Sequence, residues 1–226
     1  QETENSFSFV VPTEFVELPS KGKYYPPGHP LHNQQHIEVR HMTAKEEDIL
    51  TSRTLLKQGV ALDRVLKNII INKQINLDTL LIGDKNAMVV AARVSAYGSE
   101  YKTAITCPAC GATTKYAFNL NEASIFEGET DNSLNITPTE NGTFLIQLPL
   151  TGVTVEFKLL TGNDERHLLK GTEMDRKSKA GERGVTRSLK LFTVSVNGSN
   201  NPADINTFVD NMPSMDARQL RLAQRL

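Results

Sequence analysis

Two cysteines form the sharpest chemical signal in this chain of 226 residues. Both lie in the segment Cys107-Pro108-Ala109-Cys110-Gly111, where two thiolates on a tight turn can hold half of a tetrahedral zinc site. A complete site needs two more ligands, and the chain has no second pair of cysteines. The other candidates are a second chain or the five histidines, which are His29, His32, His36, His41 and His167. Cys107 and Cys110 are therefore a half site for zinc at most, so zinc is possible and no other cofactor is indicated.

The same cysteine pair has two other interpretations. It can be a tight turn that carries two free or disulfide-bonded thiols. A thioredoxin-like redox centre would place the pair at the N-terminus of a helix, whereas the residues on both sides here predict strands. The histidines do not favour a metal site, because four of them are irregularly spaced over residues 29–41 and Pro26, Pro27 and Pro30 prevent regular structure. We expect this region to be a surface loop.

Sequence motifs typical of enzymes are not found. The chain contains none of the patterns GxSxG, HExxH, GxxxxGK[ST] or GxGxxG. Glu46-Glu47-Asp48 and Thr161–His167 contain residue types that could act as acids and bases. Both segments begin predicted helices, where caps and acidic residues stabilise the first turn. The sequence therefore predicts a protein that is not an enzyme.

The charges of the chain nearly balance, with 25 Lys and Arg against 26 Asp and Glu. This balance argues against nucleic acid or a membrane as a partner, because both attract proteins with a strong basic excess. The distribution is nevertheless uneven. Residues 1–20 contain four acidic and no basic residues, and residues 166–190 contain eight basic residues against three acidic ones. The expected partners are other proteins, which can include further copies of this chain.

The elements that would position these residues begin with an extended arm and loop over residues 1–36. The apolar run from Phe7 to Val11 ends at Pro12, which indicates an edge strand. Residues 18–28 are rich in proline, glycine and tyrosine, so they cannot form a regular helix and must lie on a surface of this protein or of a partner.

Residues 37–120 predict a helical module with a central β-hairpin. A short strand over 37–40 precedes a helix that starts with a capping box of Thr43 and Glu46 and stops at Gly59. A second helix has its apolar residues at Leu62, Val65, Leu66, Ile69 and Ile70. Asp84 is expected to cap a third helix that ends at Gly98. Residues 101–106 and 113–118 then predict a hairpin with the cysteine pair at its tip.

The rest of the chain predicts a connection over residues 121–142 and a mixed strand and helix module over 143–226. Strands at 144–148 and 153–157 form a second hairpin, and Thr161 with Asp164 begins a helix that runs to about residue 176. We expect a mobile loop over 171–184, a strand or apolar helix over 188–196, and helices over 205–209 and 214–226. The fold class predicted from all elements is α+β.

Several short sequence segments, taken in the order in which they occur in the chain, resemble those of a known family. They are Leu18-Pro19-Ser20-Lys21-Gly22-Lys23-Tyr24-Tyr25, Met42-Thr43-Ala44-Lys45-Glu46-Glu47-Asp48-Ile49-Leu50, Leu80-Leu81-Ile82-Gly83-Asp84-Lys85, Cys107-Pro108-Ala109-Cys110 and Leu159-Leu160-Thr161-Gly162-Asn163-Asp164-Glu165. Over roughly residues 10–210 the chain resembles the baseplate hub/assembly protein family of T4-like contractile-tailed bacteriophages. The resemblance implies a structural or assembly protein of the virion tail baseplate, made in the host bacterial cytoplasm, with other tail proteins as partners. No catalytic residues carry over from it.

Three functions follow as hypotheses. The first is a structural subunit of the baseplate, with residues 1–28 and the cysteine hairpin as its contact elements. The second is a tail assembly chaperone that is not part of the virion. The third is a protein-binding module built on a zinc knuckle.

Overall fold

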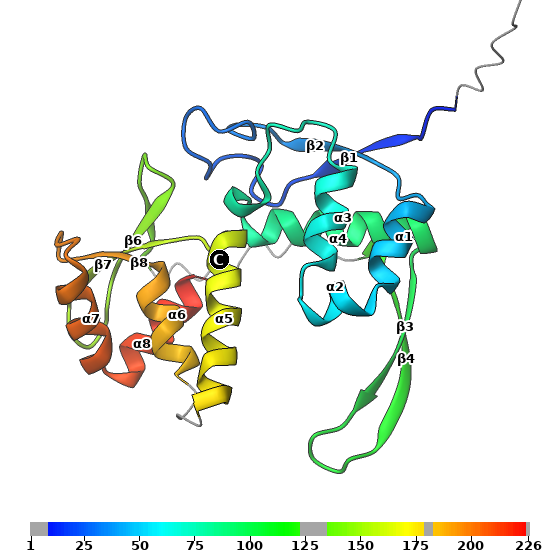
Figure 1. Ribbon diagram of the computed structural model, residues 1–226. Coiled ribbons are helices and arrows are strands. Elements are labelled where there is room, and N and C mark those ends of the chain that lie inside the picture. Colours follow the sequence, from blue (N-terminus) through cyan, green and yellow to red (C-terminus); the bar gives the residue numbers. More distant parts are fainter. Residues whose placement is uncertain (1–8, 123–134, 179–182, 225–226) are drawn as a thin grey trace, which may run out of the picture. The chain divides into compact units, whose positions relative to one another are not determined.

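Figure 1 shows the computed structural model of the chain, which describes residues 9–122, 135–178 and 183–224. Helices and strands are both present, which confirms the predicted α+β class. The chain forms two compact units whose segments alternate along the sequence. The first unit contains the described residues up to Leu18, His36–Ile75 and residues 86–122. The second contains Pro19–Gln35, Asn76–Lys85 and the described residues from 135 onward. The predicted division into four consecutive segments stays a prediction.

The first unit opens with a two-stranded antiparallel sheet of β1 (Thr13–Glu17) and β2 (His36–Arg40). The prediction of an edge strand over residues 7–11 is wrong for residues 9–11. The strand begins at Thr13, after Pro12. Strand pairing there places Val16 opposite Ile37, and both side chains are buried. An earlier strand would give no such burial, since Phe9 and Val10 are exposed. Residues 7 and 8 lie outside the described ranges.

Three short helices follow β2 in the first unit: α1 (Ala44–Thr51), α2 (Arg53–Lys57) and α3 (Ala61–Ile69). The single helix expected up to Gly59 breaks at Ser52, whose backbone is extended. The apolar stripe of α3 is present, but Leu62 is half exposed and Ala61 is buried in its place.

Helix α4 (Ile82–Tyr97) leads into the hairpin of β3 (Glu100–Thr106) and β4 (Thr113–Asn119), and the short 3-10 helix η2 (Leu120–Glu122) follows. The helix ends before Gly98, as predicted, and that glycine has a φ of 79°. The prediction that Asp84 caps the helix is wrong. The helix begins at Ile82, so Asp84 lies inside its first turn, where its side chain is fully buried.

The second unit is built on an antiparallel sheet in the order β5-β6-β7-β8, of which Figure 1 labels β6, β7 and β8. Helices α5 to α8 and the 3-10 helix η1 (Leu77–Thr79) belong to the same unit. The strands are β5 (Thr137–Pro138), β6 (Thr143–Gln147), β7 (Thr154–Lys158) and β8 (Thr193–Val196). The helices are α5 (Gly162–Ser178), α6 (Gly184–Phe192), α7 (Pro202–Asn211) and α8 (Ser214–Ala223).

The core of this unit combines the inward side chains of the sheet with the apolar faces of α6, α7 and α8. Its buried members are Ile146, Leu148, Val155, Phe157, Leu189, Phe192, Ile205, Val209, Ala217, Leu220 and Ala223. The prediction of a mobile loop over residues 171–184 is wrong for residues 171–178, because α5 continues to Ser178. Residues 179–182 lie outside the described ranges. Residues 188–196 combine both predicted states, with a helix to Phe192 and a strand after it.

Candidate functional site

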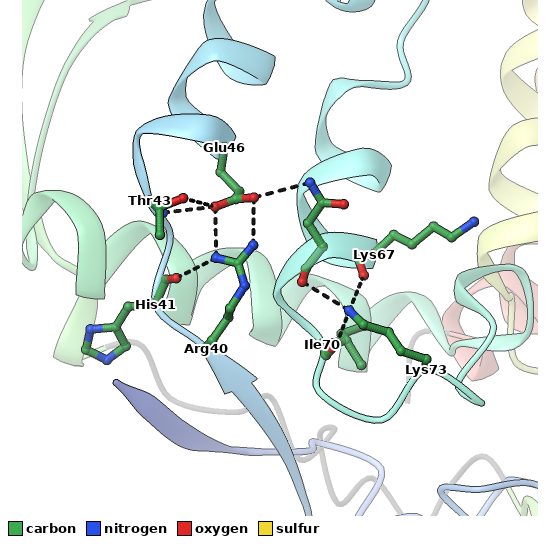
Figure 2. Close-up of polar contacts among 8 residues, drawn as sticks. Arg40, His41, Thr43, Glu46, Lys67, Ile70 and Lys73 are labelled. Atoms are coloured by element: carbon green, nitrogen blue, oxygen red, sulfur yellow. Dashed lines mark hydrogen bonds and ion pairs between the residues drawn. The ribbon is translucent and has the colours of Figure 1, made fainter. Parts of the chain in front are cut away.

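Glu46, the first of the acidic residues that the sequence offered as catalytic candidates, belongs to the first turn of α1, and its side chain is buried (Figure 2). The guanidinium of Arg40 donates two hydrogen bonds to its carboxylate, at 2.8 and 2.9 Å. The backbone N–H and the hydroxyl of Thr43 donate to it at 2.9 and 2.8 Å, and Asn68 donates at 3.2 Å. The carboxylate therefore ties β2, the start of α1 and α3 together.

This arrangement keeps Glu46 ionised. The hydrogen bonds from Arg40 hold the pKa of the Glu46 carboxyl far below its usual range, and those from Thr43 and Asn68 act in the same direction against the effect of burial. A general acid or base needs a pKa near the working pH. Glu46 consequently acts as a structural ion-pair partner and has no proton to exchange near neutral pH.

A second buried carboxylate, that of Asp84, holds the turn-rich segment after Leu18. It accepts hydrogen bonds from the backbone N–H of Ser20 at 3.0 Å, from the Ser20 hydroxyl at 2.6 Å and from the Tyr25 hydroxyl at 2.7 Å. The Tyr25 oxygen in turn accepts from the N–H of Leu81 at 3.1 Å. Burial, reinforced by the charge of Asp84, raises the pKa of Tyr25. The segment that contains Ser20 and Tyr25 is therefore held to the second unit, to which it belongs.

Two more buried carboxylates in the second unit repeat the pattern. Asp164 accepts from Lys158 at 2.9 and 3.0 Å and from the N–H and hydroxyl of Thr161, as its predicted cap requires. Burial alone would raise the pKa of Asp164, but the hydrogen bonds from Lys158 and Thr161 bring it below its ordinary value. Asp216 accepts from the N–H of Leu150 and from the N–H and hydroxyl of Thr151. These acids stabilise turns and are not gathered into one centre.

The hairpin of β3 and β4 is the clearest surface feature of the first unit. Figure 1 shows it extending well beyond the helices of that unit. Within the described ranges, no further strand joins the sheet that it forms. An isolated two-stranded hairpin is at best marginally stable in water, so this element is suited to be completed by a partner.

One face of the hairpin is aromatic and apolar. Tyr101 pairs with Phe118, Thr103 with Tyr116 and Ile105 with Thr114, so these six side chains share a face. Four of them form what we call the aromatic face, with exposed fractions of 44% for Tyr101, 48% for Ile105, 53% for Tyr116 and 43% for Phe118. The opposite face carries Glu100, Lys102, Ala104, Thr106, Thr113, Lys115, Ala117 and Asn119.

The base of the aromatic face continues onto α4. The guanidinium carbon of Arg93 lies 5.1 Å from the ring centre of Tyr97 and 6.0 Å from that of Tyr101. Aromatic rings and arginine are the residues that most often dominate binding energy at protein interfaces. The composition of this surface therefore favours a protein partner.

Cys107 and Cys110 lie in the loop that joins β3 to β4. The N–H of Cys107 donates to Ala112 O at 2.9 Å, and the N–H of Gly111 donates to Cys107 O at 2.9 Å. Hydrogen bonds from the backbone N–H groups of Cys110 and Ala109, and from the Cys110 thiol, lower the pKa of the Cys107 thiol. Both cysteines are free thiols.

The histidines do not complete this half site. In the part of the chain that the structure describes, no group of three or more His, Cys, Asp or Glu side chains could hold a metal ion. His29 bonds the Thr79 hydroxyl at 2.8 Å and stacks on Tyr25 at 4.4 Å, and His32 bonds Tyr25 O at 2.6 Å. These two are half-buried, so they are more closely packed than the expected surface loop.

The basic segment over residues 166–190 forms parts of α5 and α6. Three of its basic side chains pair with acidic ones: Arg166 with Asp78, Arg187 with Asp175 at 2.9 Å, and Lys190 with Asp210 at 2.7 Å. Arg187 and Lys190 border a shallow hollow of about 560 Å³, lined by Arg183, Thr186, Arg187, Lys190, Leu191 and Asp210. An acidic protein partner at this surface stays a prediction.

Sequence reasoning missed two parts of this picture. It did not find Asp216, whose partners lie far away in the sequence and leave no local pattern. It also overlooked the aromatic face, although the alternation of Tyr101, Thr103 and Ile105 with Thr114, Tyr116 and Phe118 is visible in the sequence. Among the described helices, none is long and apolar enough to cross a membrane.

Comparison with known proteins identifies the family. Residues 11–144 match the family described as T4 bacteriophage base plate protein, which is more than half of the chain. The matched range contains the sequence segments around Tyr25, Glu46 and Asp84 and the cysteine hairpin. The match confirms the resemblance to T4-like baseplate proteins found in the sequence. Neither the curated proteins nor the solved structures gave a match. The chain belongs to the family of T4 bacteriophage base plate proteins.

Proposed function

We propose that this protein is a structural subunit of the hub region in the baseplate of a contractile phage tail, and that it acts through protein–protein contacts. The family match supports a role in a phage baseplate. The observation that carries the proposal furthest is the aromatic face of the β3–β4 hairpin. A face of this composition is typical of a surface that becomes buried in an assembly.

The energetics of interfaces support the hairpin as the main contact element. Buried aromatic anchors at the centre of an interface typically cost ~2 kcal/mol or more when they are truncated. Tyr101, Tyr116 and Phe118 form one such cluster on two paired strands. Strand pairing restricts the backbone, so less conformational entropy is lost on binding than an unpaired segment would lose, which favours affinity.

The edge of β1 is a second contact element in this proposal. Within the described ranges, β2 is the only strand that pairs with β1, so the other edge of β1 has no strand paired with it there. Phe15 on this strand is 71% exposed. A strand from a neighbouring subunit can add to such an edge. Residues 19–28, by contrast, are engaged within their own unit, which reduces the contact region expected over residues 1–28.

The experiment that tests the proposal is quantitative mass spectrometry of purified mature phage particles. A structural subunit is expected in the particles at a fixed ratio to other baseplate proteins. Its absence from mature particles, together with a stable complex with another tail protein in infected cells, would instead establish the assembly chaperone. Cryo-electron microscopy of the same particles would show whether the subunit lies in the hub.

A further inference from the structure

The loop between β3 and β4 carries two thiols, those of Cys107 and Cys110, which could serve as two of the four ligands of a tetrahedral metal site. Strand pairing runs up to Thr106 and Thr113, so both cysteines lie in the short loop over residues 107–112. Two backbone hydrogen bonds of 2.9 Å close this loop, from the N–H of Cys107 to Ala112 O and from the N–H of Gly111 to Cys107 O. Two cysteines three positions apart on a tight turn have the spacing with which a structural zinc site takes two of its ligands.

The chain has no further cysteine that could serve as the third or fourth ligand. It contains two cysteines in all, and both are in this loop. The described residues provide no third histidine, cysteine or acidic ligand for a metal-binding group. Structural zinc sites are almost always closed by four protein ligands, and thiolates are preferred. As far as the described residues go, a structural zinc at this loop would take its other ligands from a second chain.

A second copy of the same hairpin has the chemistry to supply the missing ligands. A two-fold axis through a tetrahedral ion exchanges two pairs of ligands, so two identical cysteine loops can face each other across one metal ion. Cys110 is exposed at the tip of an extended hairpin, which allows such an approach.

Charge supports the pairing of two copies. A zinc ion with four thiolates carries a net charge of about −2. Each hairpin has Lys102 and Lys115 against a single acid, Glu100, so two hairpins together offset that charge. No acidic residue lies in the loop itself, where it would repel the thiolates.

We propose that Cys107 and Cys110 from two copies of this chain bind one Zn²⁺ in a four-thiolate site that joins their β3–β4 hairpins. The site fixes the two hairpin tips together and leaves the aromatic faces to other contacts. This inference does not depend on the place of the subunit in the baseplate.

The test uses the full chain, purified under reducing conditions without chelator after expression in zinc-supplemented medium. Zinc content is measured by plasma mass spectrometry, and the molar mass in solution by light scattering. The expected result is one zinc per two chains and a dimer that dissociates when a chelator removes the metal. One zinc per monomeric chain, or no bound zinc, would overturn the proposal.

Variants separate the effect of the thiolates from that of the rest of the hairpin. The double variant Cys107→Ser/Cys110→Ser is expected to lose both the zinc and the zinc-dependent dimer. The matched control Ala104→Ser changes an exposed position of the same hairpin, outside the cysteine loop, and should retain both. A titration of the metal-free native chain with Co²⁺ needs no variant. Its visible cobalt–thiolate absorption should reach a plateau at half an equivalent of metal per chain, and a plateau at a full equivalent would contradict the shared site.

Discussion

The Ser20 hydroxyl donates a 2.6 Å hydrogen bond to the carboxylate of Asp84, two residues that are separated by 64 positions in the sequence. Asp84 is fully buried, and Tyr25 donates to the same oxygen. Residues 18–28 are rich in glycine, proline and tyrosine, which predicts a segment without helix that lies on a surface. The hydrogen bonds instead make it an integral part of the second unit.

Replacement of this carboxylate tests that role. Asp84→Asn keeps the size of the side chain but places an amide donor among the Ser20 and Tyr25 donors. We expect the free energy of unfolding to fall by about 2–3 kcal/mol, because hydrogen bonds to a charged buried group are lost. Urea denaturation followed by circular dichroism measures the change. Asp48→Asn, at an exposed position in α1, is the control and should change the stability by less than about 0.5 kcal/mol.

Gly22 gives a second test of the same segment. Its φ is 71°, and a Cβ there would lie 2.4 Å from Gln34 N and 2.5 Å from Leu31 O. Gly28 has a φ of 90°, but its Cβ would meet no atom within 4 Å. Gly28→Ala should therefore cost only the backbone strain, ~1–2 kcal/mol, whereas Gly22→Ala should cost clearly more. Equal melting temperatures of the two variants would contradict the close approach.

The ion pair of Arg40 and Glu46 should matter more than a surface pair. Arg40→Leu leaves the Glu46 carboxylate buried without its main partner, and loss of one member of a buried pair typically costs about 3–5 kcal/mol. Lys102→Leu removes an ion pair in which both side chains are mostly exposed, and it should cost less than about 1 kcal/mol. Chemical denaturation of the two variants compares these costs directly.

The same carboxyl predicts how stability depends on acid. Its pKa is lowered in the folded protein, so the unfolded chain takes up a proton at Glu46 first as the pH falls. The stabilisation is thus present above the ordinary glutamate pKa of about 4.3 and is lost as the pH falls below it. Glu46→Gln should be less stable than the native chain at pH 7, and the difference should shrink towards pH 3. A constant difference across this range would contradict the lowered pKa.

The aromatic face should contribute to assembly and little to folding. Tyr116→Ser/Phe118→Ser removes two exposed rings, which lie 4.5 Å apart between ring centres. We expect the isolated double variant to keep its native circular dichroism spectrum and to fail in complementation of a phage that lacks the gene. Lys115→Ser on the opposite face of the same strand is the matched control and should complement. Unfolding of the double variant would show that the rings stabilise the subunit itself.

Local signals in the sequence predicted much of the secondary structure. The capping residues Thr43 and Thr161 marked the starts of α1 and α5 correctly, and alternation located β3 and β4. The hydrogen bonds of Asp84 and Asp216 could not be predicted, because the partners include Ser20, 64 positions from Asp84, and Leu150, 66 positions from Asp216. The position of β1 was missed for a related reason, since the burial of Val16 depends on its pairing with Ile37.

The alternation of the two units along the sequence has a consequence for synthesis on the ribosome. All described segments of the first unit have been synthesised once the β3–β4 hairpin and the residues up to 122 have been translated. The segment Pro19–Gln35 must wait longer for its own contacts, because the ring of Tyr24 contacts Phe144 and its backbone meets Gly142. A nascent chain that stops between these points contains every described segment of the first unit but only part of the second. The order of translation therefore makes the cysteine hairpin available before its own subunit is complete.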